Sequence, residues 1–372
     1  MNKFFIPALA LAVSAVAACS DATVKSEHTE LFKAGTEGYH TYRIPALTIS
    51  NDGTILAFCE GRTNNHKDKG DIDLVLKRST DFGKTWSELS VVKEEGENAC
   101  SSPTPVVLEN GRILLLSKWR NASYAMFDCR TEIQYSDDDG LSWSDPREIT
   151  ASVYDTTWLM NCVGPGHAIR LEKGEHKGRL IVPCYHKWTY PGEKWYGRSY
   201  LIYSDDQGET WQKGAFATAG NECMAAELSN GDIMLNMREF TIWNVMEGRH
   251  YQRYVAVSSD GGQTLSEAQL DPNLPAAVCE GSIIRYRHGH EKQDWLLFMN
   301  PEGPEKRINL KVKLSKDGGK TWKVIYCPPY ECGAYSDMVE LPDGSVALLY
   351  EAGHETMREV LAFDIIPRKM IK

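Results

Sequence analysis

The sequence predicts an all-β fold, a six-bladed β-propeller, from two short patterns that recur along its 372 residues. The first pattern is the phrase Ser-x-Asp-x-Gly-x-Thr-Trp, which first occurs at Ser79–Trp86. Further copies, two of them with one changed position, begin at Ser136, Ser204, Ser258 and Ser315. Self-similarity at a long and regular spacing is typical of repeat architectures.

The second pattern is a turn signal followed by an apolar run, and it occurs six times. The runs begin at Thr54, Ile113, Leu180, Ile233, Trp295 and Val346. Turn residues between short β-type runs indicate hairpins, and six sheets of about four strands in a ring make a propeller. The sixth unit, from about Tyr335 to Ile366, lacks the phrase. We therefore expect residues 29–32, together with 23–24, to close the ring as a strand from the N-terminal end.

Each copy of the phrase reads as a hairpin clasp. An Asp carboxylate accepts backbone N–H groups two residues on, and a Gly takes the positive φ that a tight turn needs. The Trp would pin the turn to a neighbouring strand. A calcium loop of the EF-hand type needs more oxygen ligands and a closing Glu, which the copies lack. We expect a structural clasp, and neither a metal nor another cofactor.

The first 18 residues read as a secretory signal peptide, because Lys3 is followed by an apolar run that ends in small residues. The small residues directly before Cys19 resemble the bacterial lipoprotein cleavage box, in which the Cys becomes lipid-modified. Residues 19–30 read as a polar tether, and 31–372 as a single propeller domain. We expect an exported lipoprotein, periplasmic or at the outer membrane or cell surface; a freely secreted protein is the alternative.

Charge bears on the partners that the protein can bind, and cysteine content bears on its disulfide bonds. The formal net charge of -10 argues against nucleic-acid binding, which needs a basic surface. Nine cysteines follow Cys19, an odd number that cannot pair completely. Several lie in apolar runs, where a reduced buried thiol is expected. Cys327 and Cys332 are close enough in sequence to bridge.

Arg43 stands in the apolar stretch Tyr42–Leu47, where an Arg needs a partner or an anionic ligand. With the clasps, this stretch resembles the sialidase (neuraminidase) family of glycoside hydrolases, over nearly the whole mature chain. The resemblance implies a sialidase-type propeller with its site at the centre of one face. It also implies exo-α-sialidase activity on terminal sialic acid.

Sialic acid bears a carboxylate at its anomeric carbon, which Arg holds through permanently charged, bidentate contacts. The family uses three Arg, which by motif map onto Arg43, Arg238 and Arg307. For the last two places the competing residues are Arg253, Arg285 and Arg287.

The resemblance also implies the reacting groups. A carboxylate nucleophile would be repelled by the substrate's own carboxylate, whereas a neutral hydroxyl with a nearby base would not. Sialidases use a tyrosine, which by motif is Tyr335, with Glu222 to take its proton. The implied reaction proceeds with retention through a tyrosyl-enzyme intermediate. For the general acid we choose Asp68, which aligns with the family's Asp by its separation in sequence from Arg43 and from Ser79. Asp71 remains open, and Asp73 looks like part of a strand.

Supporting roles follow from the same resemblance. Arg62 matches an Arg near the sugar's 4-hydroxyl, and Glu351 matches the carboxylate that orients Arg43. Trp119 would wall the N-acetyl or glycerol pocket, or else belong to the core. Ser102 departs from the family, in which Asp or Asn is frequent.

Two other functions stay open. One is a glycosidase or transglycosylase for a related nonulosonic acid, such as a deaminated sialic acid or an anhydro product. The other is a non-catalytic sialoglycan-binding propeller, which would need neither the Tyr335–Glu222 couple nor Asp68. In each case we expect the partners to be sialylated glycans on mucin, glycoprotein, glycolipid or oligosaccharide.

Overall fold

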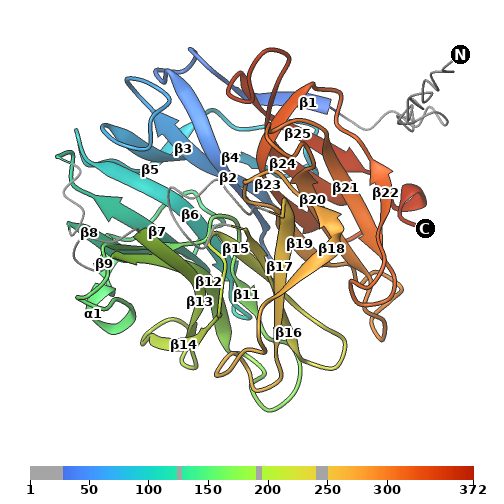
Figure 1. The fold of residues 1–372 in the computed structure, drawn as a ribbon. Coiled ribbons are helices and arrows are strands. Elements are labelled where there is room, and N and C mark those ends of the chain that lie inside the picture. The colour runs from blue at the N-terminus through green and yellow to red at the C-terminus, as the bar shows by residue number, and fades with distance from the viewer. Residues whose placement is uncertain (1–27, 124–127, 190–194, 240–249) are drawn as a thin grey trace, which may run out of the picture.

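A computed structural model describes residues 28–123, 128–189, 195–239 and 250–372. Strands radiate around a common centre (Figure 1). The only helical segments in these ranges are α1 (Thr150–Val153) and the 3-10 turn η1 (Arg368–Met370). Neither is long or apolar enough to cross a membrane.

The strands of the first three sheets follow the chain in order. The first sheet holds β2 (Thr41–Ile49), β3 (Ile55–Arg62), β4 (Ile72–Ser79) and β5 (Ser90–Lys93). The second holds β6 (Ala99–Val107), β7 (Ile113–Arg120), β8 (Cys129–Ser136) and β9 (Arg147–Glu148). The third holds β10 (Met160–Val163), β11 (Ile169–Arg170), β12 (Leu180–Thr189), β13 (Trp195–Ser204) and β14 (Gln212–Phe216).

The other three sheets complete the ring. The fourth holds β15 (Cys223–Glu227), β16 (Ile233–Arg238), β17 (Gln252–Ser258) and β18 (Gln269–Pro275). The fifth holds β19 (Ser282–Arg285), β20 (Leu296–Pro301), β21 (Leu310–Ser315) and β22 (Lys323–Tyr326). The sixth holds β23 (Cys332–Glu340), β24 (Val346–Gly353), β25 (Val360–Ile366) and β1 (His28–Lys33).

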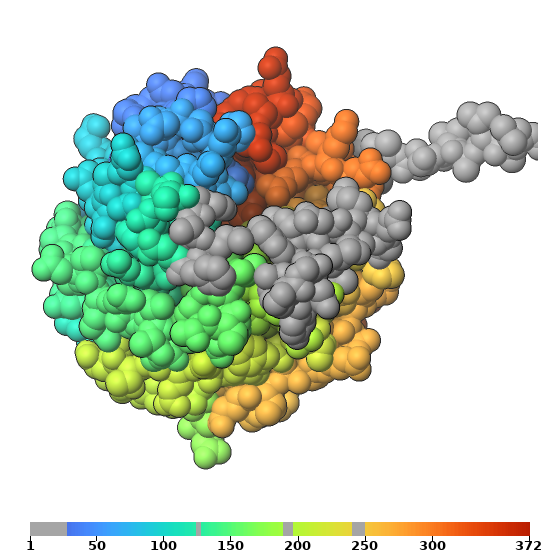
Figure 2. Space-filling model, turned by 60° about the vertical axis from the view of Figure 1, so that its left-hand side comes forward, coloured from blue at the N-terminus to red at the C-terminus, as the bar shows by residue number. Residues whose placement is uncertain are grey.

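The first two sheets are joined only by one parallel pairing, Ile72 with Ala99. They are therefore two blades side by side, and the described strands form the predicted six-bladed propeller. In Figure 2 the colours follow one another around the molecule in chain order. Consecutive blades are thus neighbours in the ring.

The ring is closed by β1, which pairs antiparallel with β25. This confirms the strand predicted at 29–32, although β1 begins at His28, within the stretch expected to be tether. The buried Asp364 accepts hydrogen bonds from His28 Nδ1 at 2.7 Å and from the hydroxyls of Tyr326 and Tyr350 at 2.7 and 2.5 Å. The bond to Asp364 raises the pKa of His28. Residues 23–24 and Cys19 lie outside the described residues.

The clasps tie neighbouring blades together. Asp81 accepts bonds from the Thr85 N–H and hydroxyl, at 2.9 and 2.6 Å. The expected bond to an N–H two residues on is wrong, because Phe82 and Gly83 both have positive φ, 59° and 86°, and carry the chain through a longer turn. The other four clasps bond four residues on in the same way. Trp86 packs edge-on against Phe363 of blade 6, with ring centroids 4.9 Å apart.

The hydrophobic core lies between the blades. Leu349 and Phe363 of blade 6 pack with Leu47 and Ile55 of blade 1, and all four are almost fully buried. Full burial of one such side chain contributes about 1.5–3 kcal/mol. Because each blade depends on both neighbours for this burial, the inner strands and their loops are held in fixed positions at the centre.

None of the nine cysteines of the described residues takes part in a disulfide. Seven of them are buried, as expected for several apolar runs. Burial raises the pKa of Cys100 to about 12. Cys327 and Cys332, whose spacing permits a bridge, do not form one in this structure.

Candidate active site

The predicted site residues gather at the end of the ring where the inner strands begin. Arg43 lies at the start of β2, Glu222 directly precedes β15, and Tyr335 lies in the first half of β23. The second strand of a blade runs antiparallel to the first, so it ends at this same level. At these ends stand Arg62, Arg238 and Glu351.

Tyr335 and Glu222 form the centre of the site. The Tyr335 hydroxyl donates a hydrogen bond to Glu222 Oε1 at 2.5 Å. Both side chains are more than nine-tenths buried. The pairing of β23 with β24 skips from Gly333 to Ser336, so Tyr335 lies in a β-bulge. A bulge bends the strand and redirects a side chain, which here brings the phenol into the site.

The environment sets opposite protonation states for this pair. Burial raises the pKa of Tyr335, and the Glu222 charge raises it further, although Arg238 and Arg307 oppose the shift. Burial also acts against the ionised form of Glu222, but the charge of Arg238 and the bond from Tyr335 outweigh it and lower the pKa. At neutral pH the phenol is therefore protonated beside an ionised carboxylate.

The three mapped Arg surround the phenol. Arg238 Nη1 lies 2.5 Å from Glu222 Oε2 and 3.3 Å from the Tyr335 hydroxyl. The guanidinium carbons of Arg43 and Arg307 lie 5.1 and 5.2 Å from the centroid of the Tyr335 ring. Three permanently charged donors thus converge on one point, which is the arrangement that a bound carboxylate requires.

Arg43 is fixed by Glu351. The Arg43 Nε and Nη2 atoms donate to the two Glu351 oxygens at 3.0 and 3.1 Å, a bidentate contact. The Arg43 side chain is 7% exposed and that of Glu351 is fully buried. Burial lowers the pKa of Arg43, but Glu351 and the other acidic groups nearby together outweigh it and raise the pKa, so the guanidinium stays charged. The remaining Nη1 faces Asp68 Oδ1 at 3.4 Å.

Asp68 stands at the mouth of the site with its side chain 72% exposed. Arg62 Nη1 donates to its Oδ1 at 2.8 Å. Desolvation by the nearby protein raises the pKa of Asp68, but the charges of Arg62 and Arg43 exceed this effect and lower the pKa. Any ligand that neutralises the charge of Arg43 would therefore raise the pKa of Asp68.

The other acidic candidates lie elsewhere. Asp73 is buried in β4, as its alternation with apolar residues indicates, and accepts the Tyr39 hydroxyl at 2.7 Å. Asp71 accepts the Thr63 N–H through its backbone carbonyl at 3.1 Å. Asp68 is the one of the three that contacts Arg43 and Arg62.

The competing Arg have other hydrogen-bond partners or lie elsewhere, although Arg253 is paired with Arg238 across the strands β17 and β16. Arg253 is fully buried, and donates to Asn236 Oδ1 at 2.7 Å and the Cys279 carbonyl at 2.6 Å. Arg285 and Arg287 line a pocket at the opposite end of the ring. The positions at the site are thus filled by Arg238 and Arg307.

Trp119 is 4% exposed and packs in the core between blades 1 and 2. Its indole N–H donates to Glu95 Oε2 at 3.0 Å. Of the two roles considered for Trp119, this position favours the core. Ser102 is buried, with its hydroxyl oxygen 3.1 Å from Cys162 Sγ and its backbone N–H donating to Glu60 Oε1 at 3.0 Å.

Several buried charged groups lie near the site but were not predicted from the sequence. Glu60 binds Arg62 Nε at 3.0 Å and Nη2 at 2.5 Å, as Glu351 binds Arg43. Burial lowers the pKa of Lys118 to about 8 and that of Lys187 to about 7. A signal for these residues existed, because each Lys interrupts an apolar strand and Glu60 alternates with Arg62 on one strand face.

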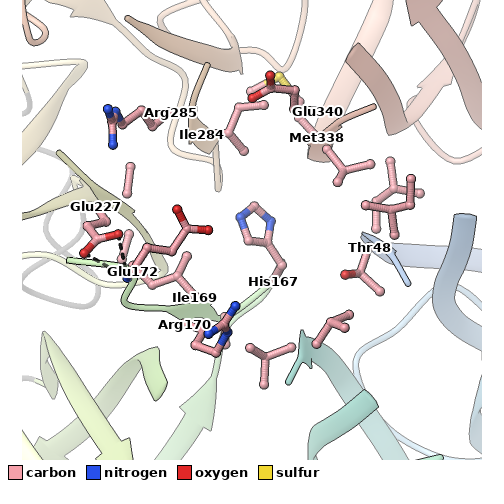
Figure 3. A pocket seen from close by; sticks show the side chains of 18 of the residues that line it. Thr48, His167, Ile169, Arg170, Glu172, Glu227, Ile284, Arg285, Met338 and Glu340 are labelled. Atoms are coloured by element: carbon pink, nitrogen blue, oxygen red, sulfur yellow. Dashed lines mark hydrogen bonds between the residues drawn. The ribbon is translucent and has the colours of Figure 1, made fainter. Parts of the chain in front are cut away.

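A cavity of about 290 Å³ opens at the far end of the central channel. Its walls include Thr48 of β2 and Glu340 of β23, the ends opposite to Arg43 and Tyr335. Figure 3 shows His167 at its centre. Its charged groups largely bind one another or the backbone: His167 Nδ1 contacts Asp337 at 2.7 Å, Arg287 pairs with Glu172, and Glu227 accepts the backbone N–H groups of residues 172 and 173. This cavity is well formed but lies far from the Tyr335–Glu222 couple.

Within the described ranges, no group of three or more His, Cys, Asp or Glu is arranged to hold a metal ion. The acidic side chains at the reacting centre face Arg instead. The arrangement can hold an anion, accept a phenolic proton at Glu222, and exchange a proton at the more exposed Asp68.

Comparison with known proteins gives a consistent assignment. The family model described as "BNR repeat-like domain" matches residues 53–348. A sialidase of Micromonospora viridifaciens is 33% identical over 341 residues, which cover 86% of this chain and 51% of that protein. A sialidase of Bacteroides fragilis is 29% identical over 365 residues, which cover 90% of this chain and 64% of that protein. The chain thus spans between half and two thirds of the length of these relatives.

Solved structures support the fold. The structure named Hadza microbial sialidase Hz136 superposes with a TM-score of 0.78 at 28% identity, covering 92% of this chain and 68% of that one. A leech intramolecular trans-sialidase gives the same TM-score at 19% identity, covering 94% of this chain and 71% of that one, a level at which the likeness concerns the fold alone.

Proposed function

This chain belongs to the sialidase family with BNR repeats, and we propose that it is an exo-α-sialidase. It would hydrolyse terminal sialic acid from glycoconjugates with retention of configuration. The observation that carries the proposal is the Tyr335–Glu222 couple at 2.5 Å, enclosed by three Arg. A protein that only binds sialoglycans has no need for a phenol hydrogen-bonded to an ionised base.

Binding is the first step that these residues support. Arg43, Arg238 and Arg307 would hold the substrate carboxylate, and this places the anomeric carbon beside the Tyr335 hydroxyl. The bound carboxylate offsets part of the Arg43 charge that lowers the pKa of Asp68. Asp68 is then more readily protonated when substrate is present, as a general acid must be.

In the glycosylation step, the Tyr335 oxygen forms a bond to the anomeric carbon as its proton passes to Glu222. The bond from that carbon to the leaving oxygen breaks, and this oxygen takes the proton of Asp68. The neutral phenol avoids the repulsion that an anionic nucleophile would meet beside the substrate carboxylate.

In the second step, water attacks the anomeric carbon and gives its proton to Asp68. The bond to Tyr335 breaks, and the phenolate recovers its proton from Glu222. Two displacements at the same carbon retain its configuration.

The test is hydrolysis of α2,3- and α2,6-sialyllactose by wild type and Tyr335→Phe, with the released sugar followed by NMR. We expect the α-anomer to appear first with wild type, and a loss of at least about 100-fold in kcat with the variant, since the covalent route is removed. Wild-type rates for Tyr335→Phe would refute the mechanism. An anhydro product would instead identify an intramolecular transfer, and binding without turnover would identify a lectin.

We also propose that the protein is exported and anchored by a lipid on Cys19. The support is the leader pattern of residues 1–18 and the small residues that precede the Cys. Its substrates would then be sialylated glycans outside the cytoplasm.

A further inference from the structure

Three inner strands carry the same irregularity at the level of the site. In β2, β6 and β23 the pairing with the next strand skips two residues, which lie opposite one residue of the partner. At each bulge a backbone N–H donates to a buried glutamate at 3.0 Å. The donor is the first skipped residue in β2 and β6, and the residue directly after the two skipped ones in β23. The pairs are Ile44 with Glu351, Ser102 with Glu60, and Ser336 with Glu280.

Two of these glutamates occupy equivalent positions in their blades. Glu60 and Glu351 are each the sixth residue of the second strand in their blade, and each reaches the bulge of the following blade. The sixth residue of the second strand in blade 5 is Pro301, which has no side-chain acceptor. The bulge of blade 6, which contains Tyr335, therefore cannot be held by the corresponding residue of blade 5.

Glu280 takes over this task from a different position. It lies two residues before β19, the inner strand of blade 5, and is 1% exposed. Its Oε2 accepts the N–H of Ser336, the residue after Tyr335. Its Oε1 makes no hydrogen bond with any described residue. The hydrogen bond to the bulge is thus the one that this buried carboxyl makes within the described chain.

We infer that Glu280 is a positioning residue for the nucleophile: it holds the bulge of β23 that aims Tyr335 at Glu222. The inference rests on the proposed function. Without the acceptor, the buried Ser336 N–H has no hydrogen-bond partner. If β23 then pairs as a regular ladder to satisfy this N–H, the side chains along β23 change register. A misplacement of about 1 Å costs on the order of 100-fold in rate.

The test compares Glu280→Ala with Glu280→Gln, whose amide oxygen still accepts the N–H. We expect Glu280→Ala to lose about 10- to 100-fold in kcat on 3'-sialyllactose with KM within about 3-fold, since the nucleophile moves and the Arg do not. A fluorinated sialosyl donor should label Tyr335 correspondingly more slowly, as followed by mass spectrometry. Glu280→Gln should restore both rates to within about 3-fold of wild type.

Glu227→Ala is the matched control. Glu227 is also a buried glutamate that accepts backbone N–H groups, at 2.9–3.1 Å, but it lies at the far end of the channel. This variant should lose thermal stability without a change in kcat. If Glu280→Ala fails to fold, Glu280→Asp replaces it, because the shorter side chain retracts the acceptor while keeping a carboxyl group, and it should show the same loss of kcat.

The inference is overturned if the folded Ala or Asp variant keeps wild-type kcat, or if Glu280→Gln loses as much as Glu280→Ala. Failure of the proposed function is seen separately, because wild type would then release no sialic acid and Tyr335 would not be labelled.

Discussion

Removal of Glu351 tests how much of the site depends on one buried ion pair. In Glu351→Ala the Arg43 guanidinium loses its bidentate partner at 3.0 and 3.1 Å, and the Ile44 N–H loses its acceptor at 3.0 Å. Breaking a buried pair from one side costs about 3–5 kcal/mol of stability, because the remaining charge is uncompensated. We expect a loss of that size in the free energy of unfolding, measured with urea.

The effect on activity follows from the orientation of Arg43. A charge-assisted hydrogen bond contributes about 1.5–3 kcal/mol. If an unsupported Arg43 loses one such bond to the substrate carboxylate, kcat/KM on 3'-sialyllactose falls about 10- to 100-fold, since 1.36 kcal/mol is tenfold. Glu351→Gln should fall less, because its oxygen still accepts one of the bonds.

Asp137→Ala provides the control for burial. Asp137 binds Arg112 in the same bidentate geometry, at 2.7 and 2.8 Å, but these side chains are 56% and 30% exposed. An exposed pair contributes about 0–1 kcal/mol, so this variant should remain near wild type in stability and activity. Equal losses in Glu351→Ala and Asp137→Ala, or an unchanged kcat/KM in Glu351→Ala, would refute the reasoning.

Three further predictions concern the acid, the clasps and the leader. Asp68→Asn should lower kcat/KM on 3'-sialyllactose about 100- to 1,000-fold and that on a nitrophenyl sialoside much less, because a good leaving group needs no proton; equal losses would exclude Asp68 as the acid. Bonds to Thr85 and Ser79 lower the pKa of Asp81 from 3.8 to about 2, so its contribution to stability is complete above about pH 4 and is lost as the pH falls towards 2. The Tm difference between wild type and Asp81→Asn should shrink over that interval, and a constant difference would contradict this. Cys19→Ala should abolish labelling by radioactive palmitate and release the protein from the membrane fraction, whereas unchanged fractionation would refute the anchor.

The ring could be predicted from the sequence because its signals are local. Each clasp closes within eight residues, and each hairpin is marked by a turn signal before an apolar run. Counting such units therefore gives the blades, and the unit without a clasp indicates where the N-terminal strand inserts. The hydrogen bonds inside the clasp could not be predicted correctly, since the positive φ of Phe82 is not evident from its residue type.

Site residues could be predicted from the sequence where a motif marks them. Arg43, Glu222 and Tyr335 lie far apart in the chain, yet the structure brings them together because they occupy the same end of three inner strands. Arg253, Arg285 and Arg287 could not be separated from Arg238 and Arg307 by sequence, since charge alone does not say where in the ring a side chain lies or which partners it finds there. Trp119 was ambiguous for the same reason, and burial between two blades favours its core role.

The blade count, the closure of the ring and the residue types that the chemistry needs can be read from the sequence, because they depend on short-range patterns. The groups that hold the reacting residues in place are known only from the packed blades. The partners of Arg43, Arg62 and the β23 bulge are Glu351, Glu60 and Glu280. The choice among buried carboxylates depends on which backbone N–H groups and guanidinium groups two neighbouring blades leave unpaired, and this becomes defined only when the blades pack together.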